Sequence, residues 1–166
     1  MTSGFKPDIG SGDGGVTGLP GGKRVKKTDP VITALALLDD LNSHLGLAAT
    51  VLTGKERAEL RRIQRALFTA GAHAAGAGGG KELERSTAEL TARIAALSKG
   101  AAPAGFAVPG RTRAGALLHI ARTRARLCEL ALWRIDRRHA ARYLNRLSDL
   151  LFLLAEKRGL TSFRER

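Results

Sequence analysis

Apolar residues recur along most of this chain every three or four positions, the spacing of one face of an α-helix. Five such segments follow one another, at about 31–52, 55–75, 81–97, 112–135 and 137–157. Links that contain glycine or proline separate several of them, as is usual between helices. The pattern predicts an all-α protein, a five-helix bundle over residues 30–160 with a short tail at 161–166.

Residues 1–29 lack this period and are rich in glycine, which predicts a loop or extended arm. A disordered basic tail is the ordinary interpretation of such a terminus. Within the arm, the segment Ser11 to Thr17 combines glycines with hydroxyl groups, and lysines follow at 23, 26 and 27. Backbone amides exposed by glycine, together with hydroxyls and lysines, can surround an anion such as phosphate. Asp29-Pro30 then predicts the start of a helix, with Asp29 as its cap.

The composition agrees with helices, because the hydrophobic fraction of 43% comes mostly from Ala and Leu and aromatic residues make up only 4%. Cys128 is the single cysteine, so no disulfide can form within the chain, and a reducing compartment is expected. We expect this thiol to fill the core. No apolar run has the length of a membrane span. The sequence therefore predicts a soluble, cytoplasmic protein.

The formal net charge of +13 points to a polyanionic partner: nucleic acid, an acidic membrane surface or a multiply charged small molecule. No aromatic residues are interleaved with the basic ones, and no nucleic-acid-binding module is recognisable. Nucleic acid is therefore the least favoured partner, although a nucleic-acid-binding helical protein stays open as a weak hypothesis on charge alone.

The fourth predicted helix carries a polar stripe at helical spacing, formed by His119, Arg122, Arg126 and Glu129. Two guanidiniums and a carboxylate on one face can bind phosphate or an acidic partner, but a solvated face with ordinary ion pairs has the same pattern. The opposite side is predicted to pack into the core through Leu117, Ile120, Leu127 and Leu130. Trp133 and Tyr143 are predicted to pack between the last two helices.

Six groups of residues, in order along the chain, resemble the motifs of PduO-type ATP:cob(I)alamin (corrinoid) adenosyltransferases. The quoted segments are Ser11–Thr17 with Arg24–Lys27, Leu38–Ser43, Ile63–Ala72, Phe106–Gly110, His119–Glu129 and Tyr143–Phe152. The last is similar almost letter for letter to the family's Y-L-N-R-L-S-D-L-L-F. The resemblance implies a five-helix bundle that forms a homotrimer, with ATP and corrinoid bound between neighbouring subunits.

In such enzymes the Co(I) of the reduced corrinoid attacks the 5′-carbon of ATP and expels triphosphate, and Mg²⁺ is bound through the phosphates. The resemblance places ATP on Ser11, Gly12, Asp13, Thr17, Gly18, Lys27, Arg126, Glu129 and Asn145. Lys27 and Arg126 would meet phosphate oxygens, and Glu129 and Asn145 the nucleoside. No residue is assigned as a protein ligand of a metal.

The residues implied for catalysis are Asp39, Phe106, Arg122 and Arg126. Asp39 would pair with Arg122 across the subunit interface, and Phe106 would lie under the corrin ring. A corrinoid-dependent mutase or a reductase is a possible partner protein.

The chain also departs from the family pattern, at Gly10, Thr33, Ala36-Leu37, Leu127 and Leu130. The family has a lysine at the first of these positions and arginines at the last two. A charged hydrogen bond contributes roughly 1.5–3 kcal/mol, so such losses would weaken ATP binding. The alternative function is therefore a non-catalytic bundle of the same fold that binds a corrinoid, a nucleotide or another polyanion.

Overall fold

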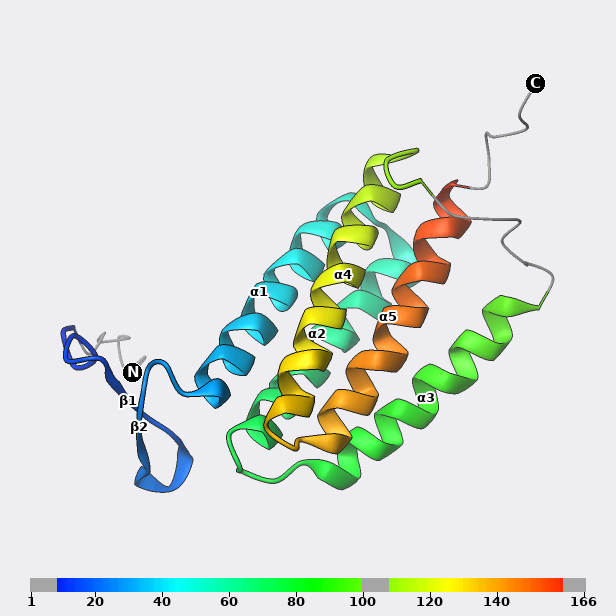
Figure 1. The fold of residues 1–166 in the computed structure, drawn as a ribbon. Helices are drawn as coiled ribbons and strands as arrows, with labels where there is room; N and C mark the ends of the chain where they lie inside the picture. Colours follow the sequence, from blue (N-terminus) through cyan, green and yellow to red (C-terminus); the bar gives the residue numbers. More distant parts are fainter. Residues whose placement is uncertain (1–8, 100–107, 160–166) are drawn as a thin grey trace, which may run out of the picture.

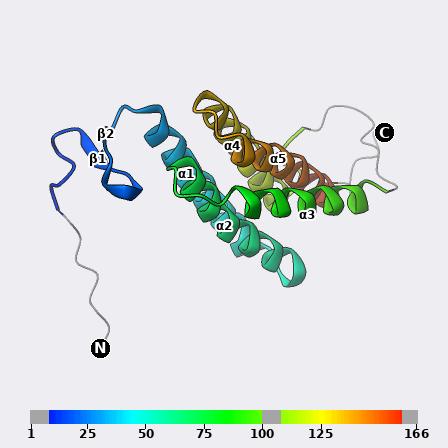
Figure 2. The same ribbon diagram turned by 90° about the horizontal axis from the view of Figure 1, so that it is seen from below.

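The computed structural model describes residues 9–99 and 108–159 and has five long helices (Figures 1 and 2). Their bounds are α1 Pro30–Val51, α2 Gly54–Ala74, α3 Gly80–Ser98, α4 Arg113–Arg134 and α5 Arg138–Gly159. Each begins and ends within a few residues of the segment that periodicity predicts. The predicted all-α five-helix bundle is confirmed.

Local chemistry sets several helix ends. The Asp29 side chain accepts a hydrogen bond of 2.9 Å from the backbone N–H of Val31, and Pro30 begins α1, as predicted. Thr112 caps α4 in the same way, because its hydroxyl accepts from the backbone N–H of Gly115 at 3.0 Å.

The core lies between α1, α2, α4 and α5, where α4 packs against both α1 and α5. Leucine and alanine fill it, with Leu41, Leu45, Leu118 and Leu147 almost fully buried. Tyr143 is 1% exposed and Cys128 is fully buried, as predicted for both. The Cys128 Sγ lies 3.1 Å from the backbone oxygen of Leu37, and burial raises the pKa of this thiol to about 12. This thiol fills the core.

Helix α3 lies across the outside of the bundle and packs mainly against α5, with a smaller contact to α2 (Figure 2). Only Leu83 and Leu90 of this helix are buried. A bidentate ion pair also attaches α3 to α2: Arg93 donates to both carboxylate oxygens of Glu59, at 2.8 and 3.2 Å. Further ion pairs join Glu89 to Arg62 of α2 and Glu84 to His139 of α5, so α3 is attached by a narrow apolar ridge and several polar contacts.

The N-terminal arm contains structure that the sequence pattern does not predict. Strands β1 (Val16–Gly18) and β2 (Arg24–Lys26) form an antiparallel hairpin in which Thr17 pairs with Val25. Both views show the hairpin standing away from the bundle (Figures 1 and 2). The described part of the arm is thus folded, and the interpretation of it as a disordered tail is wrong.

Helix α4 also differs from the prediction. Leu117 packs against the core, but Ile120, Leu127 and Leu130 are 43%, 45% and 56% exposed. The core-facing positions are instead Leu118, Ala121, Ala125, Cys128 and Leu132. Small alanines allow α4 to pack closely on α1 and α5, and they leave a second apolar face on the outside. Within the described ranges, no helix is long and apolar enough to span a membrane.

Candidate functional site

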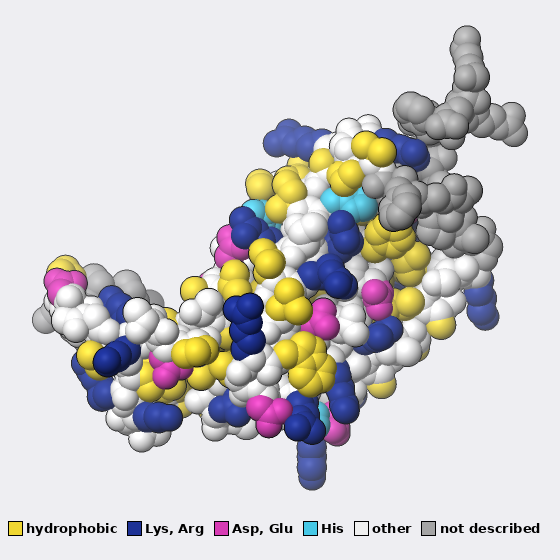
Figure 3. Space-filling model, in the orientation of Figure 1, with side chains coloured by type: hydrophobic (Ala, Val, Ile, Leu, Met, Phe, Trp, Pro, Cys, Tyr) yellow, Lys and Arg dark blue, Asp and Glu magenta, His cyan; other side chains and the backbone are white. Residues whose placement is uncertain are grey.

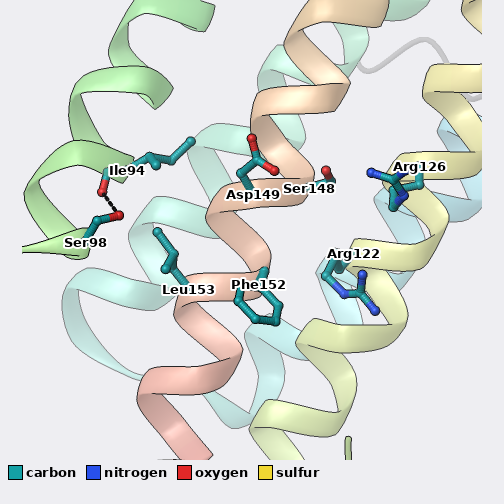
Figure 4. Close-up of a pocket in the computed structure, with 8 residues that line it drawn as sticks. All are labelled: Ile94, Ser98, Arg122, Arg126, Ser148, Asp149, Phe152 and Leu153. Atoms are coloured by element: carbon teal, nitrogen blue, oxygen red, sulfur yellow. Dashed lines mark hydrogen bonds between the residues drawn. The ribbon is translucent and has the colours of Figure 1, made fainter. Parts of the chain in front are cut away.

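A cleft of about 290 Å³ lies where α3, α4 and α5 meet (Figure 4). Arg122 and Arg126 of α4 form one wall, and residues of α5 and α3 form the others, namely Ser148, Asp149, Phe152, Leu153, Ile94 and Ser98. Figure 3 shows basic side chains on this face of the bundle, with hydrophobic ones among them. Half of the predicted polar stripe therefore lines a cleft rather than an open surface.

The two arginines give the cleft its charge. Arg126 is exposed, whereas Arg122 is half-buried, and its Nε atom is buried without a hydrogen-bond acceptor in the described part of the chain. The acid opposite, Asp149, is partly neutralised by Arg146, whose Nη1 lies 3.0 Å from Asp149 Oδ2. The two guanidiniums of Arg122 and Arg126 face one carboxylate, that of Asp149, which is already paired with Arg146. The cleft is therefore suited to an anionic ligand.

His119 closes the end of the stripe and is 6% exposed, so it belongs to the packed interior rather than to a solvated face. Its Nε2 atom lies 3.2 Å from Glu156 Oε1, and its ring meets Phe152 edge-on with centroids 6.2 Å apart. Burial lowers the pKa of His119, the charge of Arg122 lowers it further, and Glu156 opposes both. A neutral imidazole therefore supports the ring of Phe152 at the edge of the cleft.

Glu129 and Asn145, the other predicted nucleotide contacts, lie beyond the cleft along the same two helices and are half-buried. The helices α4 and α5 run antiparallel, and the His119–Glu156 contact fixes their register. Glu129 lies ten residues after His119 on α4, and Asn145 lies eleven residues before Glu156 on α5. These two residues are therefore at about the same level along the helices. The structure thus gives these two residues neighbouring positions.

The predicted phosphate residues of the arm also come together. The Lys27 ammonium lies against the turn at Gly12, 2.6 Å from where a Cβ atom would stand, and a side chain at this position would displace the end of the lysine. Backbone bonds hold the arrangement, from Lys27 N–H to the oxygen of Gly15 at 2.8 Å and from Asp13 N–H to the oxygen of Gly10 at 3.0 Å. Ser11 is exposed and Thr17 half-buried on the same segment. The arm presents hydroxyls and one lysine around a glycine turn.

Asp39 lies on a different side of the molecule, in a groove of about 290 Å³ between α1 and α2. Its neighbours there include Leu35, Asn42 and Phe68, and Phe68 is 66% exposed. The Oδ1 atom of Asn42 is buried without a hydrogen-bond partner in the described ranges. No ion pair joins Asp39 to Arg122 within the part of the chain that the structure describes. The predicted pairing joins two subunits, so it stays a prediction.

One chain thus divides the predicted site residues among three places. The arm holds Ser11, Gly12, Asp13, Thr17, Gly18 and Lys27; the α1–α2 groove holds Asp39; and the α4–α5 side holds Arg122, Arg126, Glu129 and Asn145. Phe106 lies outside the described residues. No group of three or more His, Cys, Asp or Glu side chains among the described residues could hold a metal ion.

Sequence reasoning missed several contributors to these sites. Asp40, next to Asp39, is the acid that pairs inside the chain, with Arg124 Nε at 3.0 Å. Ser148 and Phe152 line the cleft, and both sit at helical spacing from Asn145, which was the available signal.

Comparison with known proteins places these features in context. The profile of the cobalamin adenosyltransferase family matches residues 9–158. The chain is 40% identical over 154 residues to a cobalamin adenosyltransferase of Cupriavidus metallidurans, covering 87% of this chain and 83% of that protein. It is 39% identical over 158 residues to the corrinoid adenosyltransferase PduO of Salmonella typhimurium, covering 87% of this chain but only 47% of that longer protein.

The fold is also similar to that of a solved structure. A phenylalanine-to-histidine variant of the PduO-type ATP:corrinoid adenosyltransferase from Lactobacillus reuteri, complexed with cobalamin and ATP, superposes with a TM-score of 0.83. The two chains are 28% identical, and the match covers 93% of this chain and 91% of that one.

Proposed function

Since this chain belongs to the cobalamin adenosyltransferase family, we propose that it transfers the 5′-deoxyadenosyl group of ATP to a reduced corrinoid. In this reaction a cobalt–carbon bond forms to the 5′-carbon of ATP while the bond from that carbon to the phosphate oxygen breaks. The electron pair of that bond leaves with triphosphate, and Co(I) is formally oxidised to Co(III). The observation that carries the proposal is the two-arginine cleft, formed by the segment that resembles the family's main motif.

The cobalt of the substrate is itself the nucleophile, so the protein needs no nucleophilic side chain. Its residues bind and orient ATP and stabilise the charge that develops on the leaving triphosphate. Arg126 is suited to this task, because a guanidinium can donate two hydrogen bonds to phosphate oxygens and keeps its charge. Lys27 and the glycine turn at Gly12 supply a second phosphate-binding element.

The departures from the family pattern lie largely outside the cleft. Leu127 and Leu130, which stand in place of arginines, belong to the exposed apolar face of α4, and neither lines the cleft. The side chain of Leu127 is turned by about 100° from that of Arg126, whereas Leu130, one helical turn further along, lies on nearly the same face but beyond the residues that line the cleft. The charge of the cleft wall is therefore retained, which supports a catalytic function over the non-catalytic alternative.

A homotrimer with sites between subunits completes the proposal. The arm, Asp39 and the cleft lie apart in one chain, so a second copy is needed to bring an arm and an Asp39 to the cleft. Two exposed apolar features support such an interface: the α4 face with Ile120, Leu127 and Leu130, and Phe68 beside Asp39. Arg122, whose Nε has no hydrogen-bond partner among the described residues, is a suitable hydrogen-bond donor to the Asp39 carboxylate of a neighbouring subunit.

The metal and partner assignments follow from the same chemistry. ATP phosphates hold Mg²⁺ with few protein ligands, which fits a described chain without an acidic metal cluster. A cytoplasmic location is supported by the single, buried thiol of Cys128. Reduction of the corrinoid calls for a reductase, and a corrinoid-dependent mutase is a suitable recipient of the product.

Adenosylation of the corrinoid by the purified protein tests this function. With ATP, Mg²⁺ and chemically reduced cob(I)alamin, we expect adenosylcobalamin and one triphosphate for each product molecule. Arg126→Ala should lower kcat/KM on the order of 100-fold, since it removes a charged contact to phosphate. Arg124→Ala, on the same helix but paired with Asp40, is the matched control and should retain activity.

Absence of product, under conditions in which a relative such as the Cupriavidus enzyme is active, would contradict this function. Corrinoid or ATP binding without turnover would then favour the non-catalytic alternative. Binding that falls steeply with salt and is strongest for nucleic acid would favour the third hypothesis.

A further inference from the structure

The polar stripe of α4 extends one turn beyond Glu129, to Trp133. Residues 119, 122, 126, 129 and 133 follow one another at intervals of three and four, so they share one face of the helix. Trp133 is 44% exposed, which contradicts the prediction that it packs between the last two helices. It is also the single tryptophan of the chain. An exposed indole therefore stands at the end of the proposed nucleotide wall.

Helix α5 carries a matching stripe, and the two stripes face each other in rungs. A contact joins His119 to Glu156, and the cleft groups Arg122 and Arg126 with Phe152 and Asp149; helical register extends the series to Glu129 with Asn145 and Trp133 with Arg142. A contact of 3.2 Å fixes the first rung, and the members of the second and third line the cleft together. The antiparallel course of the helices carries the groove on to the last two rungs.

The indole of Trp133 is oriented by its neighbour on the stripe. Its Nε1–H donates to Glu129 Oε1 at 3.4 Å, across one helical turn. This bond uses the edge of the ring and leaves its face available. A large, oriented aromatic face with one polar edge satisfied is suited to stacking on a planar ligand.

The chemistry along the groove changes from one end to the other. The guanidinium of Arg126 suits phosphate, the carboxylate of Glu129 and the amide of Asn145 suit a ribose, and the indole of Trp133 suits a base. The order is that of a nucleoside triphosphate. Building on the proposed function, we infer that Trp133 stacks on the adenine base of ATP and is a specificity-determining residue for the base.

Tryptophan fluorescence tests this inference, because Trp133 is the only tryptophan in the chain. We expect ATP with Mg²⁺ to quench the emission, and inorganic tripolyphosphate, which lacks the base, to bind in calorimetry without quenching. Equal quenching by both probes, or bound ATP without any change in emission, would overturn the inference.

Substitution gives a second and independent measurement. Trp133→Leu should weaken ATP binding by about tenfold, since stacking of a base on an aromatic ring is worth one to two orders of magnitude. Its affinity for tripolyphosphate should not change, whereas a general loss of structure would lower both affinities. Trp133→Phe, the matched variant that keeps an aromatic face, should restore most of the ATP affinity. Unchanged ATP affinity in Trp133→Leu, or an equal loss for both probes, would refute the role.

These outcomes separate the inference from the proposed function. If ATP quenches Trp133 but no adenosylcobalamin forms, the transferase function fails and the stacking role stands. If the protein is an active transferase and Trp133→Leu binds ATP like the wild type, only the stacking role fails. Absence of any ATP binding would refute both.

Discussion

His119 shows how a single side chain is set by its surroundings rather than by its type. Sequence spacing places it with two arginines and a glutamate, yet it is 6% exposed between α4 and α5. Its partner Glu156 lies 37 positions away in the sequence. A periodic pattern shows which face a residue lies on, but not where the neighbouring helix covers that face. The polar stripe therefore begins inside the protein and ends on its surface.

The neutral state favoured by His119 has a consequence for stability. Because burial and Arg122 lower its pKa below 6.5, the folded state binds a proton less readily than the unfolded state. As the pH falls through the pKa that His119 has in the unfolded chain, the unfolded chain gains a proton and the free energy of unfolding decreases. We expect His119→Gln to lose less stability than the wild type between about pH 7 and about pH 5, as measured by urea unfolding.

Glu156→Gln is the control that changes the pKa of His119 without removing the imidazole. Glu156 raises the pKa of His119, so its removal should lower that pKa further, which NMR titration of the imidazole can follow. A His119 that titrates at or above 6.5 in the folded protein would contradict this description.

Among the elements, α3 depends on a small number of contacts. Its buried side chains are Leu83 and Leu90, and the shortest of its ion pairs to the bundle joins Arg93 to Glu59. We expect Leu90→Ala to lower the free energy of unfolding by about 2–4 kcal/mol, because it leaves a cavity under the helix. Thr91→Ala, at the exposed neighbouring position, should change it by at most about 0.5 kcal/mol. Urea unfolding measures both, and a loss for Leu90→Ala no larger than for Thr91→Ala would show that α3 is held in another way.

The helices could be predicted from the sequence because each has enough turns for its period to repeat. The hairpin could not, since strands of three residues, such as Val16–Gly18, are too short to show alternation.

Helix α4 was predicted with the wrong core face for a different reason. Alanines form its buried face, while larger apolar residues such as Leu127 and Leu130 lie outside. A pattern within one chain cannot distinguish a face that packs on its own bundle from one that suits a second copy.

At the scale of the whole molecule, the placement of the site residues explains which part of the site could be predicted. The cleft arginines come from one motif that is continuous in sequence, so their grouping was predictable, whereas Gly12 and Lys27 meet only through the hairpin. The separation of the arm and Asp39 from the cleft depends on the relative positions of elements, which no local motif specifies. Outward-facing apolar residues on α4 and beside Asp39 fit an assembly in which neighbouring chains supply the missing parts.

Complementation between two inactive variants tests this account most directly. Lys27→Ala damages the arm and Arg126→Ala damages the cleft, so each variant alone should make little adenosylcobalamin from ATP and cob(I)alamin. If an arm of one chain serves the cleft of the next, a mixed trimer has one intact site, and co-expressed variants should recover up to about a third of wild-type activity. A mixture no more active than either variant alone, with mixed trimers present, would contradict a site built between subunits.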